Sequence, residues 1–270
     1  MLDILYSFLR TLALEIVGLF GIFFALGFVL SKLQTAVQTN YHRTIGWKGI
    51  LLTAWIGTPI HEISHIFFAK IFRHRITHVS LFKPNKITGN LGHVEHSYNS
   101  LSLYQRIGNF FIGVAPMVGG SLVLAILLFF LVPNARDIYH TIDGITHDGL
   151  RAVTRVPEII KLLFADANIQ EKSFWIFLFV SFCIAAHIAP SKQDQKEMWG
   201  GFLSFAALLA LLNIIPFLLH VDPLQYVARI SVVLSVCVTL LIYALLVSFI
   251  HYIFTLVILR IPFRLLKKHL

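Results

Sequence analysis

The residues with the clearest chemistry form one short stretch, His61-Glu62-Ile63-Ser64-His65, which has the pattern HExxH. On a helix the two histidines are four residues apart and therefore share one face. Two imidazoles placed in this way can hold one zinc ion, and the glutamate between them can accept a proton from a water molecule. The stretch therefore predicts a zinc site with His61 and His65 as ligands and Glu62 as a catalytic base.

The surroundings of this motif favour a function over simple packing. A structural alternative is that the three side chains only hydrogen-bond inside a helical bundle. However, the motif lies within an apolar stretch, residues 49–72. A charged side chain at mid-membrane costs roughly 2.5–3.5 kcal/mol on insertion scales, so ionisable residues there are functional by default. Three such residues among five favour a metal site.

A zinc site needs a third protein ligand and an open position for water. Asp194 follows the fourth apolar stretch of the chain, and His187 lies seven residues earlier. Asp194 is favoured, because the end of that stretch is predicted on the same side of the membrane as His61 and His65. His187 is the alternative ligand, or a catalytic residue that stabilises the oxyanion. The non-functional interpretations are a solvated acid for Asp194 and a satisfied core histidine for His187.

The composition indicates a membrane protein. Of the 270 residues, 57% are hydrophobic and only 13% are charged, about half the charged fraction of a typical soluble domain. The net charge of +9 comes from basic residues that flank apolar segments, which favours a membrane-orientation signal and no nucleic-acid partner. Both cysteines lie in apolar runs, so neither a disulfide framework nor cysteine-ligated zinc is predicted.

The elements that must position these residues are long apolar helices. A spanning helix needs roughly 20 mostly apolar residues, which predicts an all-α polytopic membrane protein, a single domain over residues 1–270. Six spans place both termini on one side, which carries 13 of the 22 Lys and Arg residues. This bias favours termini in the cytoplasm and an active site toward the cytoplasmic side of the cell membrane. The six stretches are about 11–30, 49–72, 108–132, 173–190, 199–220 and 229–259.

Two connecting regions are long. Residues 73–106 combine alternating stretches with turn residues, which predicts a short β-hairpin or a membrane-associated cytoplasmic loop. Residues 133–172 are predicted as an extracytoplasmic loop. Four histidines in the first region can bind a regulatory metal or can simply be solvated; they are His74, His78, His93 and His96.

The order of these features resembles the site-2 protease family of intramembrane zinc metalloproteases. The resemblance covers about residues 49–200. It consists of HExxH inside a membrane helix, then a β-prone loop, then the Gly- and Pro-containing stretch 108–120, and then a stretch ending in Pro190 and Asp194. The resemblance implies a three-helix metalloprotease core over this range.

The resemblance also implies roles for individual residues. His61 and His65 match the family's zinc ligands, and Glu62 matches its base. The segment from His187 to Asp194 is similar to the family's N-x-x-P…L-D-G motif, which implies Asp194 as the third ligand. Three positions differ from that motif: His187 replaces Asn, Gln193 replaces Leu and Gln195 replaces Gly.

The sequence therefore predicts an intramembrane zinc metalloendopeptidase that acts in the lipid bilayer. Its substrate would be a membrane protein or peptide, cut in or near a transmembrane segment. The 73–106 loop can clamp the substrate by strand addition. Two alternatives from other classes are a membrane transporter or metal-handling protein, and a non-catalytic zinc-bound membrane regulator.

Overall fold

The fold is known from a computed structural model, which describes residues 2–148, 156–218 and 224–268. It is mostly helical, with one two-stranded sheet. The chain begins with a long, nearly continuous helix in which α1 and α2 are joined by a π-helical turn at Val17–Gly21. The other long helices are α3, α4, α8, α9 and α10. Their bounds are Leu2–Ile16 (α1), Ile22–Thr44 (α2), Trp47–Ile71 (α3), Leu103–Leu131 (α4), Lys172–Ala185 (α8), Lys192–Leu218 (α9) and Leu224–Phe254 (α10).

Four of the described helical segments are long and apolar enough to cross a membrane, which indicates a membrane protein. They are Ile22–Thr44, Leu103–Leu131, Lys192–Ile214 and Cys237–Leu266. Helix α8 is also apolar, but its 14 residues extend only about 21 Å, less than the roughly 30 Å of a hydrocarbon core. Helix α3 carries the ionisable residues of the HExxH motif and lies outside this set. The count of six crossings therefore stays a prediction.

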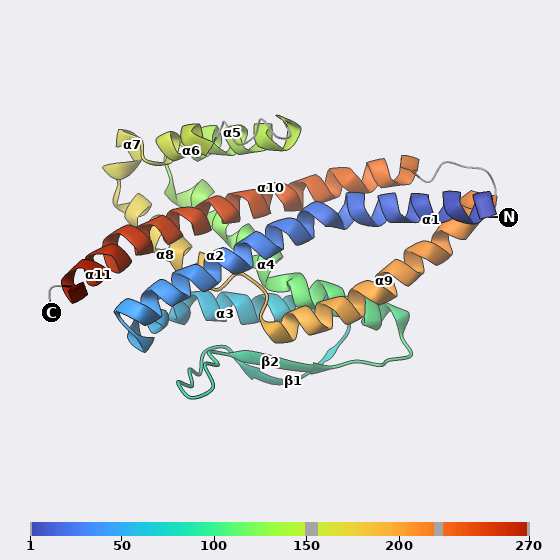
Figure 1. The fold of residues 1–270 in the computed structure, drawn as a ribbon, viewed down its shortest axis with the longest axis horizontal. Helices are drawn as coiled ribbons and strands as arrows, with labels where there is room; N and C mark the ends of the chain where they lie inside the picture. The colour runs from blue at the N-terminus through green and yellow to red at the C-terminus, as the bar shows by residue number, and fades with distance from the viewer. Residues whose placement is uncertain (1, 149–155, 219–223, 269–270) are drawn as a thin grey trace.

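The two ends of the chain lie far apart. Helix α1 begins at one end of the long axis, and α11 (Ile261–Lys268) ends at the other (Figure 1).

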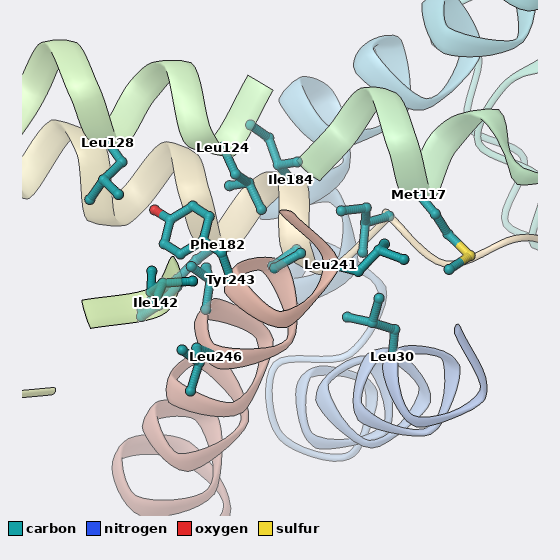
Figure 2. Packing of buried hydrophobic residues seen from close by; sticks show 14 of the residues in the cluster. Leu30, Met117, Leu124, Leu128, Ile142, Phe182, Ile184, Leu241, Tyr243 and Leu246 are labelled. Atoms are coloured by element: carbon teal, nitrogen blue, oxygen red, sulfur yellow. The ribbon is translucent and has the colours of Figure 1, made fainter. Parts of the chain in front are cut away.

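The centre of the bundle is α4, which packs against α3, α9, α8 and α10. Figure 2 shows Leu124 of α4, Ile184 of α8 and Leu241 of α10 gathered between their helices, and all three are fully buried. Glycines allow close approach where helices cross: Gly27 of α2 faces the Met117 side chain of α4. Inside a bilayer such contacts stabilise helix association through van der Waals packing.

The predicted β-prone region contains the only sheet among the described residues. Strands β1 (Arg75–Ser80) and β2 (His93–Ser97) are antiparallel, with Ser80 opposite His93. They contact α3 and lie beside it in Figure 1. The hairpin is therefore attached to the helix that carries the HExxH motif.

The region predicted as the other long loop is helical. It contains α5 (Ala135–Asp148), α6 (Val156–Leu163) and α7 (Asp166–Ile169), which lie across the bundle from the hairpin (Figure 1). Asn168 fastens this region, because its amide donates to Asn134 and to the last carbonyls of α6. Its position outside the cytoplasm stays a prediction.

Candidate metal centre

Helix α3 places His61 and His65 on one face, one turn apart. Their ring centroids are 4.9 Å apart, and His65 is buried with 6% of its surface exposed. Asp194, from the first turn of α9, meets both rings. Its carboxylate oxygens lie 3.4 Å from Nε2 of His61 and 3.3 Å from Nε2 of His65. We call these three residues the metal centre, because their ligand atoms all lie within 4.8 Å of one another.

The donor set of the metal centre fits a zinc ion. Two ligand atoms that each bind a tetrahedral zinc ion at about 2.0–2.1 Å stand roughly 3.3 Å apart. Nε2 of His61 lies 3.4 Å from Oδ2 of Asp194, and Nε2 of His65 lies 3.3 Å from Oδ1. Both separations are close to that value, with each histidine facing a different oxygen of the carboxylate. Two imidazole nitrogens and one carboxylate oxygen are also the ligand types found at catalytic zinc sites, which keep a fourth position open.

Backbone carbonyls fix the orientation of both histidines. The Nδ1–H of His61 donates to the His187 carbonyl over 2.7 Å, and the Nδ1–H of His65 donates to the Ile112 carbonyl over 2.9 Å. Because a carbonyl only accepts, each Nδ1 must carry the proton. The lone pair of a neutral ring is then at Nε2, which faces Asp194. This is the usual outer-shell arrangement of metal-binding histidines.

Asp194 reaches the metal centre because the chain unwinds before it. Helix α8 ends at Ala185, five residues before the predicted end of its apolar stretch, and Pro190 disfavours helix at the residue before it. Helix α9 then begins at Lys192, not near 199 as predicted. Ser191 caps it: the Ser191 N–H donates to Asp194 Oδ2 over 2.7 Å, and the Asp194 N–H donates to Ser191 Oγ over 3.2 Å. This reciprocal pair is a capping box, and it fixes the Asp194 carboxylate.

A glycine of α4 brings the start of α9 close to α3. A Cβ atom placed on Gly113 would lie 2.6 Å from the Asp194 carbonyl oxygen and 2.7 Å from Met198 Cβ. Those separations are too short for any larger residue without a shift. Gly113 thus allows α9 to sit against α4, next to the Ile112 carbonyl that holds His65.

The described structure brings Asp194, and not the His187 ring, to the two histidines. The Thr53 hydroxyl donates to the Ile50 carbonyl, so it accepts from Nε2–H of His187 over 3.1 Å. The ring is nearly fully buried in this position. His187 instead reaches the metal centre through its backbone carbonyl, which holds His61. A role at the oxyanion would require its ring N–H to leave Thr53.

Glu62 lies beside the metal centre and is buried, with 6% of its surface exposed. It lines two cavities that also share His61 and Ser191. The larger cavity, about 420 Å³, opens along His65, Asp194 and the second strand. The smaller cavity, about 210 Å³, lies on the side of α2. Residues 89–92 of the hairpin, which we call the hairpin tip, line the smaller cavity, and Asn90 and Gly92 among them also line the larger one.

Several residues that build the site are absent from the sequence prediction. They are the carbonyls of His187 and Ile112, the cap Ser191, and two glutamines of α2. Gln34 Oε1 accepts from Ala189 N–H over 2.8 Å, and Gln38 Nε2 donates to the Ala186 carbonyl over 3.1 Å. Only Ser191 carried a readable signal, because Ser-x-x-Asp before an apolar run is a helix-start pattern.

Two of the four loop histidines form a second polar group. His74 is buried, and its Nε2–H donates to the Gln105 carbonyl over 2.9 Å. Its Nδ1 faces Nδ1 of His96 at 3.1 Å, and Nε2 of His96 faces Glu197 Oε2 at 3.2 Å. We call these three residues the hairpin relay, because they connect the base of the hairpin to α9. Burial lowers the pKa of His74.

Comparison with known proteins adds no relative: no protein-family profile, curated protein or solved structure matches this chain.

Proposed function

We propose that this chain is an intramembrane zinc metalloendopeptidase that hydrolyses a peptide bond in or near a transmembrane segment of a membrane protein. The observation that carries the proposal is the convergence of His61, His65 and Asp194, with the Glu62 carboxylate beside them. The two cavities provide room for a substrate on both sides of this point. The resemblance of residues 49–200 to the site-2 protease family supports the same reaction.

Each residue of the site has its own role in the proposed reaction. His61, His65 and Asp194 hold the zinc ion, which when bound supplies a Lewis acid for water and for the substrate carbonyl. The Glu62 carboxylate accepts a proton from the attacking water and delivers it to the leaving amine nitrogen. The carbonyls of His187 and Ile112 keep the imidazoles in the orientation that presents Nε2. His187 thereby acts as a positioning residue.

The setting of the reaction is also part of the proposal. The chain crosses the cell membrane, with about six predicted transmembrane stretches and the site toward the cytoplasmic side. A helical substrate hides its carbonyls in internal hydrogen bonds, so it must unwind before cleavage. The hairpin, which contacts α3, can hold such an unwound segment by strand addition.

The experiment that tests the proposal compares wild-type protein with the Glu62→Gln variant, both purified in detergent. Metal content is measured for each, together with cleavage of detergent-solubilised transmembrane peptides. We expect near-stoichiometric zinc in both proteins and cleavage by the wild type alone. Metal flux in liposomes that survives Glu62→Gln would favour a transporter. Zinc without any cleavage would favour a non-catalytic regulator.

A further inference from the structure

The smaller cavity beside the metal centre has a polar lining that the roles above do not explain. Four polar side chains line it besides those of His61, Glu62, His187 and Ser191, in a protein that is 57% hydrophobic. Polar side chains within membrane helices normally bond across helices. The four side chains are Gln34, Gln38, Thr58 and Asn90.

The two glutamines are held in known orientations. They stand four residues apart on α2 and therefore share one face. Gln34 uses its oxygen to accept from the Ala189 N–H, so its Nε2 group is directed elsewhere. Gln38 uses its nitrogen to donate to the Ala186 carbonyl, so its Oε1 is directed elsewhere. Within the described chain, neither Gln34 Nε2 nor Gln38 Oε1 has a further partner.

Thr58 of α3 adds an independent observation on the lining of the same cavity. It is buried, with 4% of its surface exposed, and its hydroxyl has no hydrogen-bond partner among the described residues. It lies against Gly92 of the hairpin tip, where a Cβ atom would be 2.9 Å from Thr58 Cγ2. A buried polar atom without a partner costs free energy, so this part of the lining is polar without serving the packing of the described chain.

We infer that this cavity is a substrate subsite that receives a carboxamide side chain, Gln or Asn, next to the bond that is cut. A carboxamide presents one acceptor oxygen and one NH₂ donor, which complement Gln34 Nε2 and Gln38 Oε1. The volume of about 210 Å³ accommodates such a side chain. The cavity shares His61 and Glu62 with the reaction centre, which places its occupant beside the scissile bond. The inference rests on the proposed protease function.

The test uses detergent-solubilised peptides that share one apolar segment and differ at a single position, which is Gln, Leu or Lys. That position is moved along the segment, and mass spectrometry locates the bond that is cut. The wild-type protein should cut beside Gln about tenfold faster than beside Leu, the value of roughly one well-formed hydrogen bond. Equal rates beside Gln and Leu, at every position, would overturn the subsite.

A variant separates recognition from support of the fold. Gln34→Glu keeps an oxygen for the Ala189 N–H but replaces the free NH₂ group by a second oxygen. We expect it to retain zinc, to lose the preference for Gln, and to cut beside Lys faster than the wild type does. The matched control is Gln170→Glu, which adds the same charge at an exposed position after α7 and should leave the preference unchanged.

The outcomes distinguish the two levels of the proposal. If Gln34→Glu slows the cutting of all three peptides by one common factor, the glutamine only supports the 186–189 segment and the subsite is wrong. If no peptide shows cleavage that depends on Glu62, the protease function itself is wrong, and the subsite is rejected with it.

Discussion

Two groups in this molecule have the same composition but opposite geometry. The metal centre and the hairpin relay each consist of two histidines and one acid of α9, and the two acids, Asp194 and Glu197, are only three residues apart. In the metal centre both rings direct Nε2 at one carboxylate. In the relay the groups form a line, with two Nδ1 atoms facing each other and the acid at the far end.

The difference lies in what holds the second nitrogen of each ring. Backbone carbonyls hold Nδ1 of both His61 and His65, so both lone pairs converge. In the relay only His74 is held by a carbonyl, and it is held through Nε2. Residue types alone therefore do not distinguish a metal site from a structural bridge. The distinction depends on the hydrogen-bond partners of the ring nitrogens that face away from the acid.

Removing each acid in turn should give the largest difference between the metal centre and the hairpin relay. Asp194→Ala removes a proposed zinc ligand and should lower zinc affinity by more than about 100-fold, the upper end of losses from outer-shell changes alone. Glu197→Ala should leave zinc affinity within a few-fold of wild type. Metal content and competition with a chromogenic chelator measure both. Zinc loss in Glu197→Ala equal to that in Asp194→Ala would show that the two groups are not distinct.

A glycine substitution tests how α4 places Asp194. Gly113→Ala puts a methyl group 2.6 Å from the Asp194 carbonyl, so α9 must move. We expect zinc affinity to fall by about 10- to 100-fold, the range of supporting-shell changes. Gly200→Ala on α9 is the control, because a Cβ there meets nothing within 4 Å. That control should keep its zinc and gain about 1 kcal/mol from helix propensity.

The capping box offers a smaller perturbation of the same carboxylate. Ser191→Ala removes the hydroxyl that accepts from Asp194 N–H, at a cost of about 1 kcal/mol for a lost cap. Zinc affinity should fall several-fold, because the Asp194 side chain gains freedom. Ser102→Ala removes the cap of α4, where Ser102 accepts from Gln105 N–H. It should cost similar stability and leave zinc bound. Thermal unfolding and chelator competition, measured on both variants, separate the two effects.

The hairpin relay predicts an effect on the hairpin alone. His96→Leu removes the contacts with Glu197 and His74 and should destabilise the attachment of β2 by about 1 kcal/mol. Amide hydrogen exchange of residues 93–97 should then be about five- to tenfold faster than in wild type. Zinc content should not change. Unchanged exchange in this variant would mean that the strands are held by α3 contacts and not by the relay.

The smallest expected effect is a pH dependence of the relay. Burial lowers the pKa of His74 below its ordinary value of 6.5. The folded chain keeps His74 neutral, while the unfolded chain takes up a proton as the pH falls below about 6.5. The stability that this site contributes is therefore full above that pH and is lost as the pH falls toward the lowered folded value. Exchange of β2 amides should rise in that window, and less so in His74→Gln.

The sequence predicts the helical membrane class and the β-prone region, and the structure agrees with both at that level. Helix ends were predicted less well. Hydropathy ends a helix where apolar residues end, so it missed the polar first turn of α9 and the early end of α8. Ser191-x-x-Asp194 sets the first of these boundaries. The second depends on Gln34 and Gln38 of α2, which are about 150 residues away and bond to the unwound backbone.

The structure groups His61, His65 and Asp194, the three residues that the motif and the predicted topology favour as ligands. The sequence could not predict which backbone carbonyls orient the two imidazoles, because every residue carries a backbone carbonyl. Its direction depends on where α8 unwinds and on how closely α4 and α9 pack at Gly113. Such contacts between distant segments are set by tertiary packing, and local patterns carry no record of them.

The hairpin tip has a consequence for kinetics. Asn90 and Gly92 line both cavities, so the same few residues stand over either side of the reaction centre. Two fragments formed by one cut would both leave past this segment, whichever cavity each occupies. For the proposed peptidase this shared exit predicts that product release is slower than bond breaking. The expected time course is a rapid first turnover followed by a slower steady rate.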